Sequence, residues 1–113
     1  DGARLLSSRT VAYMTRNHLP GNADLDAFGR KIFAESQFAG VGFGLGFSVV
    51  LDPVPGKSLT SVGEYAWGGL ASTAFYVDPV EEITGMFFTQ FVPSSTYPVR
   101  AQLRTLVTQA LVD

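Results

Sequence analysis

The feature that most constrains the fold is a change of hydrophobic period along the chain. Residues 40–93 are rich in runs where apolar positions alternate with small or polar ones, the pattern of β-strands. Turn sequences divide this region, as in DPVPGK at 52–57 and DPVEE at 78–82. Residues 97–112 instead space their apolar side chains as an α-helix does. The pattern predicts a meander of antiparallel strands followed by a C-terminal helix.

Four strand segments follow from the alternation and the turns. GVGFGLGFSVVLD (40–52) is expected to be one strand, with a nearly bare glycine face and an apolar face. SVGEYAWGG (61–69) and STAFYVDP (72–79) are predicted strands joined by a very short connection. ITGMFFTQF (83–91) is apolar on both faces, so we expect it in the middle of the sheet with layers above and below.

The N-terminal third is predicted to be a helix followed by a linker. SSRTVAYMTRNHLPG (7–21) has Ser7 or Ser8 as N-cap and a stop at Pro20. Residues 22–40 are ambiguous, because DLDAFGRKIFAES (24–36) could form a helical turn or two but contains a glycine. The expected organisation is helix and linker over 1–39, antiparallel strands over 40–93 and a helix over 97–112.

The C-terminal helix should carry a single apolar stripe that lies across the sheet. Arg100, Arg104 and Gln109 are expected away from that stripe. The stripe consists of Val99, Leu103, Leu106, Val107, Ala110 and Leu111. The resulting class is α+β: an antiparallel sheet with flanking helices. One or two helices cannot cover two apolar sheet faces, so one face should stay open unless another segment or a second subunit closes it.

The composition narrows the possible partners. Charged residues make up 16% of the chain, against about 25% in typical soluble domains. The 8 Lys and Arg residues are scattered singly, so no nucleic-acid partner is expected. Without Cys, disulfides and thiolate metal sites are excluded. No apolar run approaches the roughly 18 residues of a membrane span, and DGARLLSSRT has no signal-peptide core. We therefore expect no membrane span and a chain that begins inside a longer protein, while cytoplasm and periplasm both remain open.

The stretch EYAWGGLAST (64–73) is the strongest candidate for a site. It carries Trp67 directly into Gly68 and Gly69. Glycines at a strand end allow close approach by another backbone or a ligand. The alternative is that Trp67 is an ordinary core residue, and the residues alone leave both interpretations open.

Other chemistry finds little support in the residues. His18 is the only histidine and stands at a predicted helix end, where a capping or surface role is expected. There is no G-x-S-x-G motif for a serine triad. A metal site needs several converging His and carboxylate ligands, and the chain has one His and scattered acids. Leu45 occupies the last position that G-x-G-x-x-G requires. Glu81 and Glu82 lie in a predicted turn rather than across a cleft, as a glycosidase pair would.

The run YAWGGLASTAFYVDPVEEITGMFFTQFVP, with RAQLRTLVTQALVD after it, resembles the C-terminal part of the serine β-lactamase-like hydrolases. The closest resemblance is to the class C-like esterases, known as family VIII carboxylesterases, whose usual segment is W-G-G-x-x-G-T-x-F-x-V-D-P. GARLLSSRTVAYMTRNHLPG also resembles the helix and loop that precede this segment in those proteins.

The resemblance implies an acyl-enzyme hydrolase acting on carboxylic esters, with β-lactams as a related substrate, and without metal or cofactor. Its third motif, K-T-G in the β-lactamases, would be Trp67-Gly68-Gly69 here and would line the substrate cleft. The backbone N–H of Leu70 would be one of two oxyanion-hole donors, each worth roughly 3 kcal/mol. Trp67 in place of Lys removes the cation that recognises a β-lactam carboxylate, which favours neutral esters.

The sequence departs from the family pattern in three places. The usual Gly-Thr after the motif is Ser72-Thr73, which makes the backbone near Ser72 a point of interest. No serine has Lys three residues on, and no tyrosine has Asn two residues on, so S-x-x-K and Y-x-N are both missing. Nucleophile, general base and second oxyanion donor must therefore come from elsewhere.

Three hypotheses result. The chain is the C-terminal portion of a serine esterase, inactive alone and completed by an N-terminal remainder docked on the open sheet face. Alternatively, it is a non-catalytic interaction module that dimerises through that face. In the third, it is an unrelated α+β ligand-binding domain with Trp67 in its core.

Overall fold

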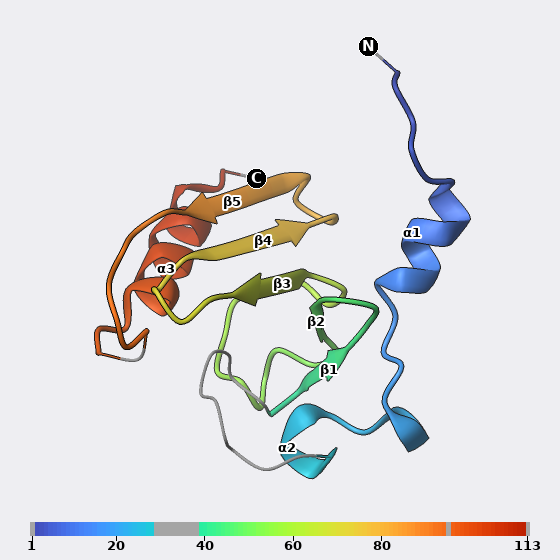
Figure 1. Cartoon of the computed structure of the whole chain (residues 1–113), viewed down its shortest axis with the longest axis horizontal. Coiled ribbons are helices and arrows are strands. Elements are labelled where there is room, and N and C mark those ends of the chain that lie inside the picture. The colour runs from blue at the N-terminus through green and yellow to red at the C-terminus, as the bar shows by residue number, and fades with distance from the viewer. Residues whose placement is uncertain (1, 29–38, 95, 113) are drawn as a thin grey trace.

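A computed structural model describes residues 2–28, 39–94 and 96–112. Its centre is a five-stranded antiparallel sheet in the order β1-β2-β3-β4-β5 (Figure 1). The strands are β1 (Val41–Phe43), β2 (Ser48–Val50), β3 (Tyr65–Gly68), β4 (Ala74–Asp78) and β5 (Ile83–Phe87). Each strand pairs with the next one in sequence, so the predicted meander and α+β class are confirmed.

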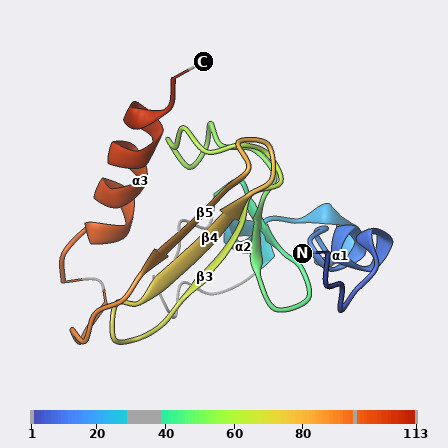
Figure 2. The same ribbon diagram turned by 90° about the horizontal axis from the view of Figure 1, so that it is seen from above.

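Helices flank the sheet unequally. They are α1 (Ser8–Met14), the 3₁₀ turn η1 (Pro20–Asn22), α2 (Leu25–Phe28) and α3 (Val99–Ala110). Figure 2 shows α3 lying across one face of β3, β4 and β5, while α1 stands at the other end of the molecule. None of the described helices covers the opposite face of the sheet along β3–β5 (Figures 1 and 2).

The predicted first helix is shorter than expected. Ser7 is its N-cap, accepting a hydrogen bond on Oγ from the Thr10 N–H at 3.1 Å. The helix ends at Met14 rather than before Pro20, and His18 lies outside it. The Asn17 side chain holds the segment that follows the helix. Its Oδ1 accepts a hydrogen bond from the Phe43 N–H at 3.0 Å, and its Nδ2 donates to the Ala23 carbonyl at 2.9 Å. This one side chain therefore ties the segment after α1 to the sheet edge.

The prediction of one strand over 40–52 is wrong. The segment folds back into the β1–β2 hairpin, with the Gly44 N–H donating to the Phe47 carbonyl at 2.8 Å. The bare glycine face is nevertheless used for close packing. A Cβ on Gly42 would lie 2.4 Å from Asn17 Oδ1, and one on Gly44 would lie 2.2 Å from the Met14 carbonyl oxygen. The glycines let the segment after α1 lie directly on the hairpin.

The prediction that 83–91 lies in the middle of the sheet is also wrong. β5 ends at Phe87 and is the last strand of the described sheet. Side chains in and next to this strand are largely exposed. Met86 is 62% exposed, and Phe88, which lies just beyond the strand, is 80% exposed. Apolar residues on both faces of an edge strand are unusual, because edges normally carry charge or proline against further pairing.

The hydrophobic core is thin. Among the described residues, Val49 and Tyr76 are the only apolar side chains that count as buried, at 3% and 7% exposure. The chain is 46% hydrophobic, and most of the large apolar side chains among the described residues are partly or largely exposed. Residues 29–38, part of the ambiguous linker in the sequence, lie outside the described residues.

Candidate functional site

The candidate site is the tight turn between β3 and β4, residues 69–73. Two backbone hydrogen bonds close it: the Gly69 N–H donates to the Thr73 carbonyl at 3.0 Å, and the Ser72 N–H donates to the Gly69 carbonyl at 3.0 Å. The flanking strands are in register from Tyr65 opposite Val77 to Gly68 opposite Ala74. The turn is thus held at both ends by a regular antiparallel ladder.

Trp67 and Gly68 face opposite sides of the sheet, because successive strand residues alternate. Trp67 pairs across the sheet with Phe75 and meets the ring of Phe43 edge-on, with centroids 5.2 Å apart. Its side chain is 41% exposed. Among the described residues, Trp67 therefore lies partly exposed on the sheet face opposite α3.

Gly68 turns its open side toward α3, where Arg100 fills it. A Cβ on Gly68 would lie 2.7 Å from Cζ and Nη2 of Arg100 and 3.0 Å from Nη1. These nearly equal distances place the planar guanidinium across the glycine. The group that approaches this glycine closely is thus an arginine of the chain's own C-terminal helix.

Arg100 also bonds both ends of the turn. Its Nη2 donates to the Gly69 carbonyl at 2.8 Å and to the Thr73 carbonyl at 2.9 Å. These are charge-assisted hydrogen bonds, which are stronger than neutral ones. The Arg100 Nη2 atom therefore bonds both ends of the turn that begins at the Trp67-Gly68-Gly69 motif.

The Leu70 N–H has a definite direction as a consequence. It shares a planar trans peptide with the Gly69 carbonyl, and in such a peptide C=O and N–H point in opposite directions. Because that carbonyl is directed at Arg100, the Leu70 N–H points away from it. Within residues 2–28, 39–94 and 96–112, no group accepts a hydrogen bond from this N–H. It is available to an acceptor from outside the chain.

Ser72 shows why the family pattern has glycine at its position. Its φ of 71° lies in the left-handed region, which glycine adopts without steric cost. The serine is tolerated with a compensating bond, since its Oγ donates to the Phe91 carbonyl at 2.6 Å. Its side chain is 3% exposed, so this bond is shielded from water. The turn therefore keeps the conformation that the glycine pattern requires.

Farther along α3, Arg104 forms a second link to the sheet. It makes an ion pair with Glu64, which is 3% exposed, and its guanidinium lies over the Tyr76 ring at 4.4 Å. Burial lowers the pKa of Arg104 to about 10, so the group stays charged at neutral pH. Burial, and then the nearby Asp78 charge, raise the pKa of Tyr76.

These contacts correct the predicted orientation of the C-terminal helix. Arg100 and Arg104 point toward the sheet, whereas Leu106, expected on the buried stripe, is 64% exposed. Between helix and sheet lies a cavity of about 640 Å³, whose lining includes Ser48, Tyr76 and Leu103. The helix therefore contacts the sheet through two arginines instead of a continuous apolar interface.

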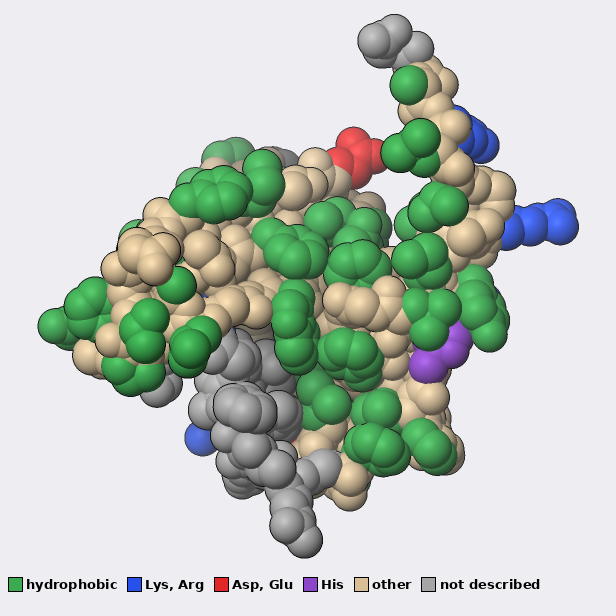
Figure 3. All heavy atoms as spheres, in the orientation of Figure 1, with side chains coloured by type: hydrophobic (Ala, Val, Ile, Leu, Met, Phe, Trp, Pro, Cys, Tyr) green, Lys and Arg blue, Asp and Glu red, His purple; other side chains and the backbone are tan. Residues whose placement is uncertain are grey.

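The sheet face opposite α3 is open and apolar. Figure 3 shows hydrophobic side chains gathered over the strands on this face. Phe47 contacts Tyr65 and Phe75, with ring centroids 5.3 and 6.1 Å apart. Met86 lies opposite Phe75 in the register. We call this surface, formed by Phe47, Tyr65, Trp67, Phe75 and Met86, the aromatic face.

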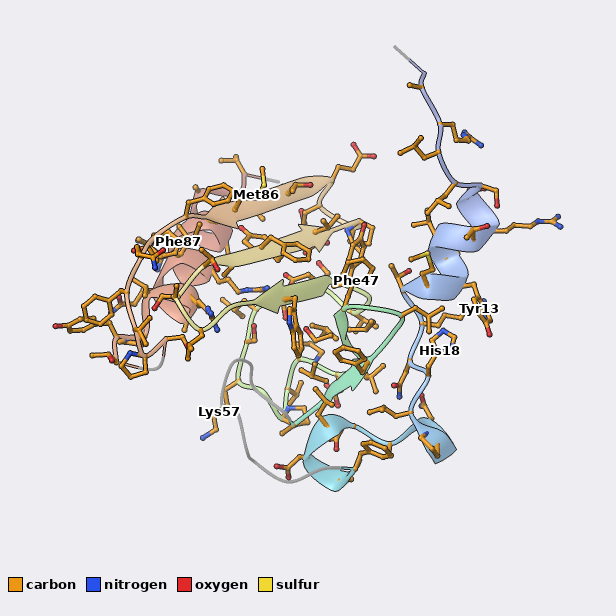
Figure 4. All side chains as sticks on the ribbon, in the orientation of Figure 1. Tyr13, His18, Phe47, Lys57, Met86 and Phe87 are labelled. Carbon is orange, nitrogen blue, oxygen red and sulfur yellow. The ribbon has the colours of Figure 1, made fainter. Side chains whose placement is uncertain are left out.

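His18 has local partners. Its Nε2 lies 2.8 Å from the Tyr13 carbonyl oxygen and its ring meets the Tyr13 ring at 4.7 Å, an arrangement visible in Figure 4. Glu81 and Glu82 lie in the β4–β5 turn, as predicted. The described residues include no group of three or more acids and histidines placed to hold a metal ion. No described helix is both long and apolar enough to cross a membrane.

Sequence reasoning found the turn but missed Arg100 and Asn17. Helical periodicity assigned Arg100 to the polar side of α3, and nothing in the sequence links it to a strand about 30 residues earlier. The one available signal was Gly68, since a strand-end glycine indicates that some group comes close.

Two curated proteins are similar to most of this chain. No family model matches the chain. Two curated relatives from Mycobacterium tuberculosis, uncharacterized protein MT1414 (strain CDC 1551 / Oshkosh) and protein Rv1367c (strain H37Rv), are each 32% identical over 97 residues, which are 82% of this chain. The match covers 23% of each relative, so the chain spans about a quarter of their length.

A solved structure gives a similar result. EstCE1, described as a hydrolase with promiscuous acyltransferase activity, matches with a TM-score of 0.72 and 25% identity. The match covers 90% of this chain and 24% of the EstCE1 chain. The described chain therefore has a β-lactamase/esterase-like fold, over a region that is a fraction of the matched hydrolase.

Proposed function

We propose that the chain is the C-terminal portion of a serine hydrolase that cleaves carboxylic esters through an acyl-enzyme. The observation that carries the proposal is the Leu70 N–H, directed away from Arg100 at the end of β3 with no acceptor among the described residues. Two further observations support it: the likeness to EstCE1, and matches that cover about a quarter of each longer relative.

In the proposed reaction, this chain forms one wall of the substrate cleft. A serine supplied by the remainder of the protein attacks the ester carbonyl, and the carbonyl oxygen becomes an oxyanion. The Leu70 N–H donates a hydrogen bond to that oxygen, an interaction worth roughly 3 kcal/mol in comparable sites. The alcohol then leaves with a proton, forming the acyl-enzyme, and water releases the acid and regenerates the serine.

The aromatic face is the docking surface for the remainder of the protein. It is open here, and Trp67 on it is half exposed beside the turn. Docking would bury this apolar surface and place the nucleophile near Leu70. The absence of Lys at the first motif position leaves no cation there for a β-lactam carboxylate, so neutral esters are the proposed substrates.

Substituting Trp67 tests the proposed acyl contact. In the protein expressed from its natural gene, Trp67→Ala should shift selectivity toward longer nitrophenyl esters by about 10-fold, because hydrophobic pockets discriminate on that scale. The measurement is kcat/KM across an acyl-chain series, with Val80→Ala in the exposed β4–β5 turn as the matched control. Unchanged ratios across the series would remove Trp67 from the site.

One observation favours a second candidate function, a non-catalytic module that dimerises. The core is thin and the aromatic face is open, so a second copy could cover it. Sedimentation of the 113-residue chain decides this point: a concentration-dependent dimer whose association is weakened by Met86→Glu supports the module, and a monomer at all concentrations argues against it.

A further inference from the structure

We infer that Arg100 is a positioning residue for the oxyanion hole, holding and polarising the peptide that carries the Leu70 N–H. The inference rests on the proposed function and adds to it a residue on the far side of the strand from the substrate. Its basis is the contact of one guanidinium with Gly68, Gly69 and Thr73.

The geometry fixes the orientation of one peptide. The Gly69 carbonyl accepts two hydrogen bonds, from Arg100 Nη2 at 2.8 Å and from the Ser72 N–H at 3.0 Å. Both lone pairs of this oxygen are then used, so rotation of the Gly69–Leu70 peptide would break two bonds at once. Glycine permits a wider range of backbone conformations than other residue types, so without these bonds the Gly69–Leu70 peptide would rotate more freely.

Charge adds a second effect. Arg100 carries a positive charge and donates to the oxygen of the same amide whose N–H faces the proposed oxyanion. Hydrogen bonds in such a chain strengthen one another, because each polarises the amide between them. The Leu70 N–H becomes a better donor where negative charge develops, which is the condition for lowering an activation barrier.

The same contact links Gly68 to the position of Arg100. A methyl group there would lie 2.7 Å from the guanidinium carbon, closer than such contacts occur, and would displace Arg100. Gly68 and Arg100 therefore form one unit: the glycine provides the space and the arginine fills it. Their substitutions should not be additive.

The test uses the protein expressed from its natural gene, assayed with a nitrophenyl ester. Arg100→Ala should lower kcat by about 10- to 100-fold with KM changed less than about twofold, since misplacing a catalytic group by about 1 Å costs that order. Affinity for a boronic acid that mimics the tetrahedral intermediate should fall in parallel with kcat/KM. Added guanidinium ion at non-denaturing concentration should restore part of the activity of Arg100→Ala.

Two further variants separate positioning from general destabilisation. Gly68→Ala should lower kcat in the wild-type background but add little to Arg100→Ala, and Gln102→Ala, on the exposed side of α3, should leave kcat unchanged. If Arg100→Ala does not fold, Arg100→Lys and Gly68→Ala carry the same test, each with reduced kcat and nearly constant KM. The Leu70 amide resonance, followed by NMR, should shift in every Arg100 variant.

The outcomes are distinct. An active wild type with kcat unchanged in Arg100→Ala overturns the role of Arg100 and leaves the proposed function standing. A kcat loss without rescue, with Gly68→Ala fully additive, overturns it as well. A wild type with no esterase activity overturns the proposed function and the catalytic part of this inference together, and the Leu70 resonance then reports whether Arg100 still orients the peptide.

Discussion

At the scale of single residues, the β3–β4 turn depends on which conformations its positions demand. Gly68 leaves space that the Arg100 guanidinium occupies, whereas Ser72 occupies a left-handed position without being glycine. The two cases differ physically: the first concerns space outside the backbone, the second the backbone itself. Positions 68 and 72 are therefore subject to two separate constraints.

Ser72 gives a prediction with a built-in comparison. Ser72→Ala loses the bond to the Phe91 carbonyl and keeps the left-handed strain, so it should reduce the free energy of unfolding by about 1–2 kcal/mol. Ser72→Gly loses the same bond but relieves about 1 kcal/mol of strain, so it should lie close to wild type. Urea unfolding of the natural gene product measures both, and equal losses in the two variants would contradict the account of the backbone.

At the scale of elements, α3 contacts the sheet through two arginines, one of which, Arg104, forms an ion pair with Glu64. The Arg104–Glu64 pair lies beside the cavity, with Glu64 almost completely buried. Removing one partner of such a pair leaves a buried charge uncompensated, whereas removing both often costs little. The link between helix and sheet is thus sensitive to single changes.

This gives a prediction for a double-mutant cycle. Arg104→Met should lower the free energy of unfolding by about 3 kcal/mol, because it leaves the buried Glu64 carboxyl without its partner. Adding Glu64→Gln should recover most of that loss. Thermal unfolding of the single and double variants provides the measurement, and additive losses would show that the two side chains do not act as a pair.

The short helix α2 gives a prediction for pH. Asp24 accepts hydrogen bonds from the Gly40 N–H at 2.9 Å and the Ala27 N–H at 2.8 Å, which hold the pKa of its carboxyl below the usual range. A carboxyl with a depressed folded-state pKa stabilises the fold fully above its unfolded pKa of about 4, and this contribution is lost as pH falls through the folded value.

An NMR titration of the Asp24 side chain should therefore show a midpoint below that of an unstructured aspartate. Asp24→Asn should flatten the acid limb of the stability profile. A midpoint at or above the unstructured value would contradict the assigned hydrogen bonds.

At the scale of the whole molecule, alternation and turn residues were sufficient to predict the antiparallel meander and the final helix. They did not predict the features that depend on tertiary contacts. The run 40–52 was predicted as one strand because its glycines alternate regularly, yet Gly44 to Phe47 turns the chain back. Arg100 and Arg104 were placed away from the sheet, since periodicity shows which residues share a helix face but not which face turns inward.

The candidate site was predictable in part, for the same reason. The turn at 69–73 follows from its glycines, and the family resemblance pointed to Leu70. The direction of the Leu70 N–H could not be predicted, because it depends on a carbonyl bonded by an arginine about 30 residues later. The exposed aromatic face agrees with the expectation of an open sheet face, while what covers it remains a proposal.

The most direct test is the intact mass of the protein purified from its natural source, with nitrophenyl ester hydrolysis assayed on the same sample. We predict a species several times heavier than the 12.1 kDa of this chain, with esterase activity. A species of 12.1 kDa without activity would contradict the proposal that these residues form one wall of a serine hydrolase.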